Sequence, residues 1–109
     1  MSRIIAQTPA TIEEIELLLT KSSLVLVTIY RILQKKEKTK ITEIYEEMKK
    51  YYGTGCLMTI ARVVRDLSIH NFITLEKTYK FPFTIWIKLT EKGRKIAEKL
   101  LEVEKLLGE

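Results

Sequence analysis

The stretch that decides the fold runs from Ile41 to Glu104 and reads ITEIYEEMKKYYGTGCLMTIARVVRDLSIHNFITLEKTYKFPFTIWIKLTEKGRKIAEKLLEVE. Its apolar residues first follow a helical spacing, alternate after Asn71, and return to a helical spacing after Leu89. Intervals of three and four residues are typical of helices, and alternation is typical of half-buried strands. We therefore expect a helix, a turn, a second helix, a β-hairpin and a long final helix, in that order.

The first part of this stretch predicts two helices joined by a tight turn. Thr42 is placed to cap a helix that ends at residue 51 or 52. Gly53 and Gly55 follow, and glycine allows the left-handed backbone conformation that a tight reversal needs. The next helix, over about 56–69, has one apolar face, formed by Ile60, Val63, Val64 and Leu67.

The alternating part predicts a hairpin with one buried face. Apolar residues occupy every second position on both strands, at Ile73 and Leu75 and then at Phe83, Ile85, Ile87 and Leu89. We expect Phe81 and Phe83 to anchor the base of the hairpin, next to a turn formed by residues 77–82. Trp86 falls on the opposite face, so we expect the N-terminal helix or a second subunit to cover it, rather than a ligand.

The final helix carries an apolar stripe that needs a partner. Thr90 is placed to cap this helix. The stripe, with the spacing of a coiled coil, consists of Ile96, Leu100, Val103 and Leu107. A stripe of this length on a small domain predicts burial against a second copy of the chain. Three residues of the N-terminal helix are expected to contribute to the same interface: Ile12, Ile15 and Leu19.

The N-terminal residues are expected to form an arm followed by a first helix. We expect residues 1–10 to form a flexible arm and residues 11–109 to form a single domain. Thr11 and Glu14 have the spacing of a capping box, in which each side chain satisfies a backbone N–H at the start of a helix.

A second helix and a short strand are expected before the decisive stretch. Either Ser22 or Ser23 could cap a helix over about 24–35. After a charged connector, Lys40–Ile41 is expected to form a short strand that pairs with the hairpin.

Charge is concentrated in the middle of the chain. The formal net charge is +5, and residues 51–95 carry eight basic and three acidic side chains, whereas residues 96–109 carry two and four. A localised excess of positive charge is typical of a protein that binds a polyanion. A solvated surface of lysine and glutamate would give the same count.

Composition limits the cellular setting. The longest apolar run, from Leu24 to Leu33, has 10 residues and contains Arg31, which is too short to span a bilayer. One cysteine excludes an internal disulfide, and we expect a cytoplasmic protein without membrane contact. Few amides beside many Lys, Glu and Ile residues suggest a thermophilic source, although an AT-rich genome gives a similar bias.

The order of elements resembles a winged helix-turn-helix domain, of the kind found in MarR-like and PadR-like transcription regulators and their archaeal relatives. The resemblance is carried by TIARVVRDLSIHNFI (59–73), KITEIYEEM (40–48) and LTEKGRKIAEKL (89–100). It implies a mainly α, α+β fold with an N-terminal helix and a long C-terminal helix. The recognition helix would be about 56–69, the wing about 72–89 and the dimerisation helix about 90–107.

The resemblance and the residues together predict binding of double-stranded DNA. On the recognition helix we expect contacts from Met58, Thr59, Arg62 and Arg65, because arginine pairs with guanine edges or phosphates. On the wing we expect contacts from Lys77, Tyr79 and Lys80. The expected function is sequence-specific binding as a homodimer that regulates transcription. The alternatives are a protein–protein adaptor and a sequence-independent architectural DNA binder. The sequence identifies no effector.

Other chemistries find little support. We expect no enzyme, no cofactor and no metal, because the chain lacks a nucleophile–base pairing and has only one His and one Cys. Cys56 lies at the start of a helix, where a thiol could serve as a redox sensor. We expect instead a small buried residue at that position.

Overall fold

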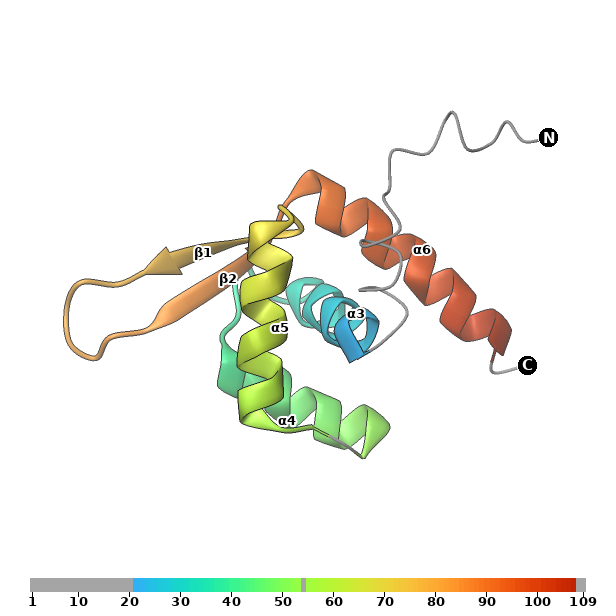
Figure 1. The fold of residues 1–109 in the computed structure, drawn as a ribbon, viewed down its shortest axis with the longest axis horizontal. Coiled ribbons are helices and arrows are strands. Elements are labelled where there is room, and N and C mark those ends of the chain that lie inside the picture. Colours follow the sequence, from blue (N-terminus) through green and yellow to red (C-terminus); the bar gives the residue numbers. More distant parts are fainter. Residues whose placement is uncertain (1–20, 54, 108–109) are drawn as a thin grey trace.

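The computed structural model describes residues 21–53 and 55–107, and the predicted arm and first helix lie outside them. The described part is mainly helical, with one two-stranded antiparallel sheet (Figure 1). The elements in chain order are α3 (Lys21–Leu33), α4 (Ile41–Tyr52), α5 (Leu57–Ile69), β1 (Ile73–Lys77), β2 (Ile85–Leu89) and α6 (Glu91–Leu107).

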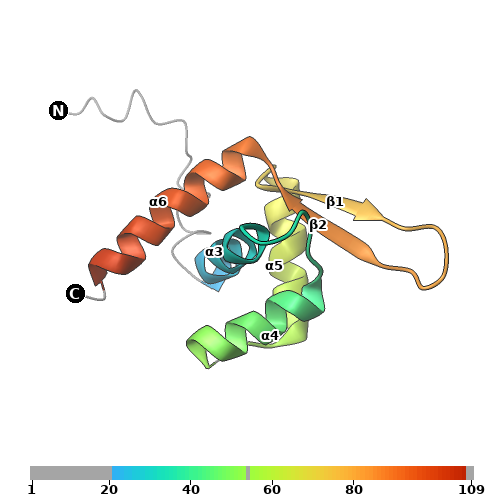
Figure 2. The same ribbon diagram turned by 180° about the vertical axis from the view of Figure 1, so that it is seen from behind.

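Helix α3 is the centre of the fold. It lies between α6 on one side and α4 with α5 on the other, as both views of the ribbon show (Figures 1 and 2). Its central residues from Val25 to Ile29 are all buried, which is expected for a helix with neighbours on several sides. Ser22 and Ser23 lie inside the described helix, so the prediction that one of them caps a helix starting at Leu24 is wrong.

Helix α4 begins two residues earlier than expected. Lys40 is the N-cap, with an extended backbone, and its carbonyl accepts hydrogen bonds from the amides of Glu43 and Ile44. The prediction of Thr42 as the cap is therefore wrong. The threonine that contacts this first turn is Thr39, whose hydroxyl donates to Glu43 at 2.7 Å. At the other end Gly53 has φ 68°, and its N–H donates to the carbonyl of Lys49.

The short strand before α4 is a single bridge, one residue before its predicted position. Thr39 pairs with Ile87, with hydrogen bonds of 3.0 and 2.7 Å between their backbones. The hairpin itself runs in register from Ile73 opposite Leu89 to Lys77 opposite Ile85. The bridge between Thr39 and Ile87 joins the hairpin to the connector between α3 and α4.

The hairpin has a buried face only at its root. Ile73 and Ile87 are buried, whereas Leu75 and Ile85 are 38% and 40% exposed because the strands extend beyond the helices (Figure 1). The predicted anchoring role of Phe81 and Phe83 is wrong, since both lie at the far tip.

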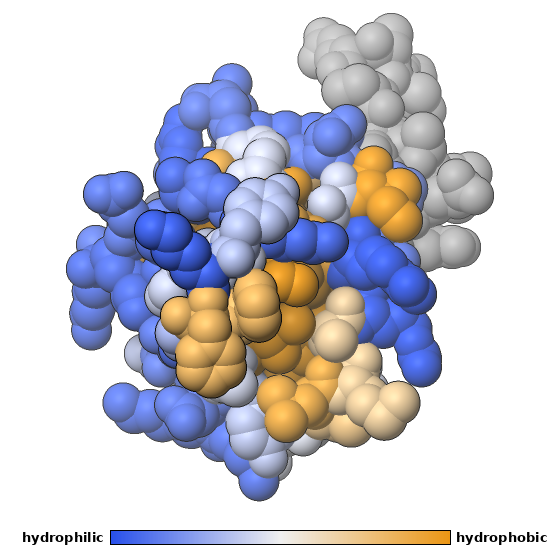
Figure 3. Space-filling model, turned by 90° about the vertical axis from the view of Figure 1, so that its left-hand side faces the viewer, coloured by the Kyte–Doolittle hydropathy of each residue, from blue (hydrophilic) through white to orange (hydrophobic). Residues whose placement is uncertain are grey.

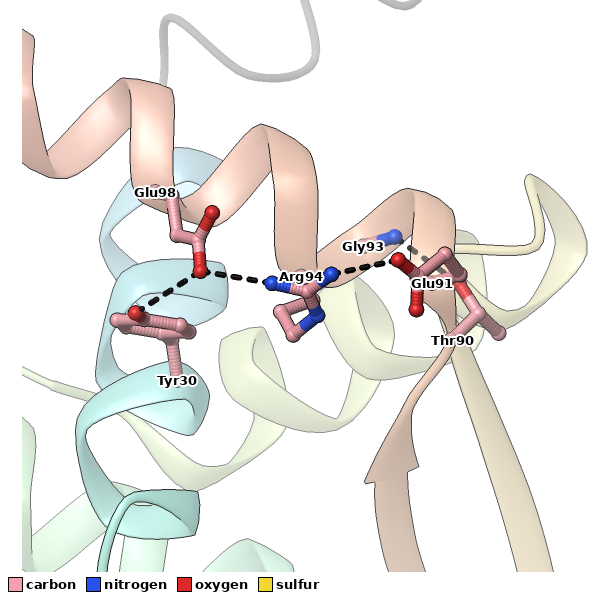
Figure 4. A network of polar contacts seen from close by, with 6 residues as sticks. All are labelled: Tyr30, Thr90, Glu91, Gly93, Arg94 and Glu98. Carbon is pink, nitrogen blue, oxygen red and sulfur yellow. Dashed lines mark hydrogen bonds and ion pairs between the residues drawn. The ribbon is translucent and has the colours of Figure 1, made fainter.

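A corner joins the hairpin to α6. The Thr90 hydroxyl accepts from the amide of Gly93 at 3.0 Å, which confirms the predicted cap, and donates to the carbonyl of Asn71 at 2.6 Å. Asn71 has φ 66°, the left-handed conformation that asparagine tolerates. A polar chain then continues along α6, from Glu91 through Arg94 and Glu98 to Tyr30 of α3 (Figure 4).

Candidate nucleic-acid interface

Helix α5 presents its two arginines to solvent. Its apolar residues Ile60, Val63, Val64 and Leu67 are buried as predicted. Arg62 and Arg65 are three positions apart, so they share the opposite, exposed face. Within the described residues neither arginine has an ion-pair partner, Asp66 included. Both guanidinium groups are therefore available to a ligand.

The other two described arginines are held by the protein. Arg31 donates to the Tyr52 hydroxyl at 2.8 Å and pairs with Glu104 at 2.6 Å, and Arg94 pairs with Glu91 and Glu98. Burial of its side chain lowers the pKa of Arg31, but the hydrogen bonds that it donates to Tyr52 and Glu104 together outweigh burial and raise the pKa. Arg31 therefore links α3 to α4 and α6, and Arg94 forms ion pairs within α6, in contrast to the arginines of α5.

The start of α5 is more exposed than the sequence suggested. Met58 is 73% exposed, Leu57 is 46% exposed and Thr59 is half-buried. Cys56 is exposed, so the expectation of a small buried residue is wrong. Cys56 is the N-cap of α5, before the first helical turn, and the nearby backbone N–H groups of Thr59 and Met58 hold the pKa of its thiol below the ordinary value.

The hairpin tip contains more aromatic surface than predicted. Lys77 and Lys80 are exposed, and Tyr79 is 88% exposed, as expected for the wing. Phe81 and Phe83 are 86% and 72% exposed beside them. The sequence did contain a signal for this, because Pro82 between two phenylalanines interrupts the alternation before β2 begins.

The outer face of the hairpin is covered by lysines. The Nζ atoms of Lys38 and Lys40 lie 4.9 and 5.5 Å from the centre of the Trp86 ring. Within the described residues, lysines of the charged connector contact Trp86, and the predicted N-terminal helix lies outside these residues. Glu76 lies on the same face, 3.9 Å from Lys38 and 3.6 Å from Lys88. These two lysines compensate the negative charge of Glu76, the one carboxylate of the hairpin.

Only part of the predicted dimer stripe is free. Ile96 and Leu100 are half-buried and pack against the core of their own chain, mainly next to α3. Val103 is 46% exposed. Ile12, Ile15 and Leu19 lie outside the described residues, as does the side chain of Leu107.

The described residues contain neither a candidate metal site nor a candidate membrane-spanning helix. No group of three or more His, Cys, Asp or Glu side chains is placed to hold a metal ion there. No helix in this part of the chain combines the length and apolarity needed to cross a bilayer.

Several solved structures have the same arrangement of elements, and two of the three below are described as a transcription factor or regulator. YodB of Bacillus subtilis, in its diamide-treated form, is similar with a TM-score of 0.66 and 15% identity over 91% of this chain and 90% of that one. A PadR-like transcription factor of Bacteroides fragilis is similar with a TM-score of 0.64 and 20% identity, over 83% of this chain and 88% of that one. A putative transcriptional regulator of Thermoplasma acidophilum is similar with a TM-score of 0.63 and 16% identity, over 81% of this chain and 90% of that one.

The fold is a winged helix-turn-helix. In these terms α4 and α5 form the helix-turn-helix, α5 is in the position of the recognition helix, and the β1–β2 hairpin is the wing. No model of a known family matches the sequence, and no curated protein matches it.

Proposed function

We propose that the chain binds double-stranded DNA sequence-specifically as a homodimer and regulates transcription in the cytoplasm. The observation that carries the proposal is the pair of exposed arginines on α5, which have no ion-pair partner within the described residues. Leaving two such guanidinium groups uncompensated on the helix next to a basic wing favours a polyanionic ligand. The winged-helix fold supports the same reading, as does its similarity to a transcription factor of Bacteroides fragilis and a putative transcriptional regulator of Thermoplasma acidophilum.

Helix α5 and the wing have different roles in this proposal. Helix α5 enters the major groove, where Arg62 and Arg65 pair with guanine O6 and N7 or with phosphates. Met58 and Thr59 lie nearer the start of the helix and contact a base edge or a thymine methyl. Lys77 and Lys80 neutralise phosphates, which fixes the position of the protein without reading sequence.

Selection of bound fragments from genomic DNA, followed by sequencing, tests sequence specificity. A regulator enriches a defined, near-palindromic motif, with half-sites about one DNA turn apart. A uniform recovery of fragments would instead indicate an architectural DNA binder. Negligible binding to any duplex at low salt would favour the protein–protein adaptor and would overturn the proposal.

The wing lysines are expected to govern the salt dependence of binding. Each neutralised phosphate releases condensed counterions, so the logarithm of affinity falls with the logarithm of salt by about 0.9 per contact. The Lys77→Gln/Lys80→Gln variant should lower this slope by about 2. Titrations of a fluorescent duplex at several salt concentrations measure the slope. A slope equal to that of the wild type would exclude both lysines from phosphate contact.

Dimerisation is expected to depend on the exposed end of the α6 stripe. Val103→Glu should convert a dimer to a monomer, because it places a charge on apolar surface that the fold of one chain leaves uncovered. Sedimentation equilibrium measures the mass. Lys105→Glu is the control, since two residues along a helix is about 200° around its axis. A wild-type monomer, or a dimeric Val103→Glu variant, would contradict this assignment.

A further inference from the structure

The tip of the wing concentrates aromatic side chains that the proposed phosphate contacts do not use. Tyr79, Phe81 and Phe83 are each more than 70% exposed, with values of 88%, 86% and 72%. Soluble proteins seldom expose several large apolar residues together unless the surface binds something. Figure 3, in which the end of the hairpin faces the viewer, shows this apolar region bordered by hydrophilic side chains.

The tip has a defined shape. Thr78 closes the loop at its base: its amide donates to the carbonyl of Thr84 at 2.9 Å, and the amide of Thr84 donates to its hydroxyl at 2.8 Å. Within the loop Phe81 and Phe83 meet edge to face, with ring centroids 6.2 Å apart. Phe81 and Phe83 are thus in contact with each other before any ligand binds, which lowers the entropic cost of ordering them on binding.

The charge around the tip selects the kind of partner. Residues 77–84 contain two lysines and no acidic residue, and Glu76, the one carboxylate of the hairpin, is offset by Lys38 and Lys88. A second copy of this tip would bring like charges together. A polyanion with apolar surfaces between its charges matches both features, and the stacked bases of DNA beside their phosphates are such a surface.

The wing is long enough to reach the minor groove next to the major groove that α5 is proposed to enter. β1 follows α5 after three residues and packs against it, and the hairpin then extends away from the helices (Figure 1). Four residue steps of about 3.3 Å place Lys77 roughly 13 Å beyond Ile73, and residues 79–83 extend further. Half a turn of DNA is about 17 Å, the separation of a major groove from the adjacent minor groove.

We propose that Phe81, supported by Phe83, inserts from the minor groove between two base pairs and kinks the DNA beside the site that α5 reads. This inference rests on the proposed DNA binding. Apolar side chains that act as wedges unstack a base step and bend the duplex by about 20–90° toward the major groove. Binding should therefore favour flexible pyrimidine–purine steps at that position, although no hydrogen bond reads them.

The experiment uses a duplex recovered by the genomic selection, labelled for energy transfer between its ends and carrying 2-aminopurine at the flanking steps. Wild-type protein should shorten the end-to-end distance and raise the 2-aminopurine fluorescence. Phe81→Ala/Phe83→Ala should abolish both signals and weaken binding about tenfold, with the salt slope unchanged. Tyr51→Ala, which removes an aromatic residue that is 56% exposed on α4, is the matched control and should retain both signals.

The outcomes separate the two proposals. If wild-type protein binds no duplex, the proposed function and the wedge both fail. If the Phe81→Ala/Phe83→Ala variant binds and bends DNA as the wild type does, the wedge alone fails. The wedge also fails if the wild type leaves DNA straight and binds vesicles of anionic phospholipid through the same two residues, because the tip is then a membrane contact.

Discussion

Arg62→Ala/Arg65→Ala is expected to weaken binding to the selected duplex by at least about thirtyfold. Each bidentate arginine–guanine pair contributes about 1–3 kcal/mol of discrimination, and the variant removes both. Binding to bulk DNA should fall much less, so the specificity ratio collapses. Competition titrations with the selected duplex and with random-sequence DNA measure that ratio.

A charge-preserving variant separates base recognition from phosphate contact. Lysine keeps the charge but lacks the planar fork that matches a guanine edge. If the arginines read bases, Arg62→Lys/Arg65→Lys should lose nearly as much specificity as the alanine variant. Both arginines are exposed on a helix, so thermal stability should stay close to that of the wild type. Unchanged DNA binding in the alanine variant would disprove the role of α5 as the recognition helix.

Gly93→Ala is expected to destabilise the fold by about 3 kcal/mol or more, through overpacking. Gly93 is buried in the first turn of α6, where a Cβ atom would lie 1.9 Å from the carbonyl oxygen of Phe72 and 2.8 Å from its carbonyl carbon. These are backbone atoms and cannot rotate away, so α6 would have to separate from the start of the wing. Urea denaturation followed by circular dichroism measures the loss.

The matched control for this variant is Gly53→Ala. A Cβ at Gly53 meets nothing within 4 Å, but the residue has φ +68°, so only the backbone conformation opposes the change. The expected cost is about 1–2 kcal/mol. If Gly93→Ala were no more destabilising than Gly53→Ala, the close approach of α6 to Phe72 would not constrain the fold.

The sequence predicts the parts of this fold in which local pattern and tertiary environment agree. The buried face of α5 follows from the spacing of its apolar residues, and the cap at Thr90 follows from its place before a helix. Asn71 has the left-handed conformation, which asparagine tolerates better than most residues. Each of these features depends on a few neighbouring residues.

The errors arise where distant parts of the chain decide the outcome. Alternation predicts that Phe83 and Ile85 share a face, but it does not say how far the hairpin extends beyond the helices. The same pattern therefore gave an anchor where the structure has an exposed tip. The lysine contacts of Trp86 could not be predicted from a local pattern either, since Lys38 and Lys40 are nearly 50 residues away from it in the sequence.

In the candidate site, too, some features depend on neighbouring residues and others on distant parts of the chain. The exposure of Arg62 and Arg65 could be predicted because the apolar face of α5 fixes the opposite one. Their lack of ion-pair partners among the described residues could not, since it depends on where every carboxylate lies. The exposure of Cys56 was missed for a related reason: a shift of one residue at a helix start moves a side chain from the helix to its cap.

The corner at Thr90 makes the wing and α6 mechanically dependent on each other. One hydroxyl holds the carbonyl of Asn71 and the amide of Gly93, and Gly93 leaves no space between helix and strand. In a dimer held through α6, a change in the angle at which the two helices cross would displace both wings. The distance between half-sites that the dimer can span would change with it. A molecule that alters the helix pair could thus control DNA binding without touching α5 or the wing.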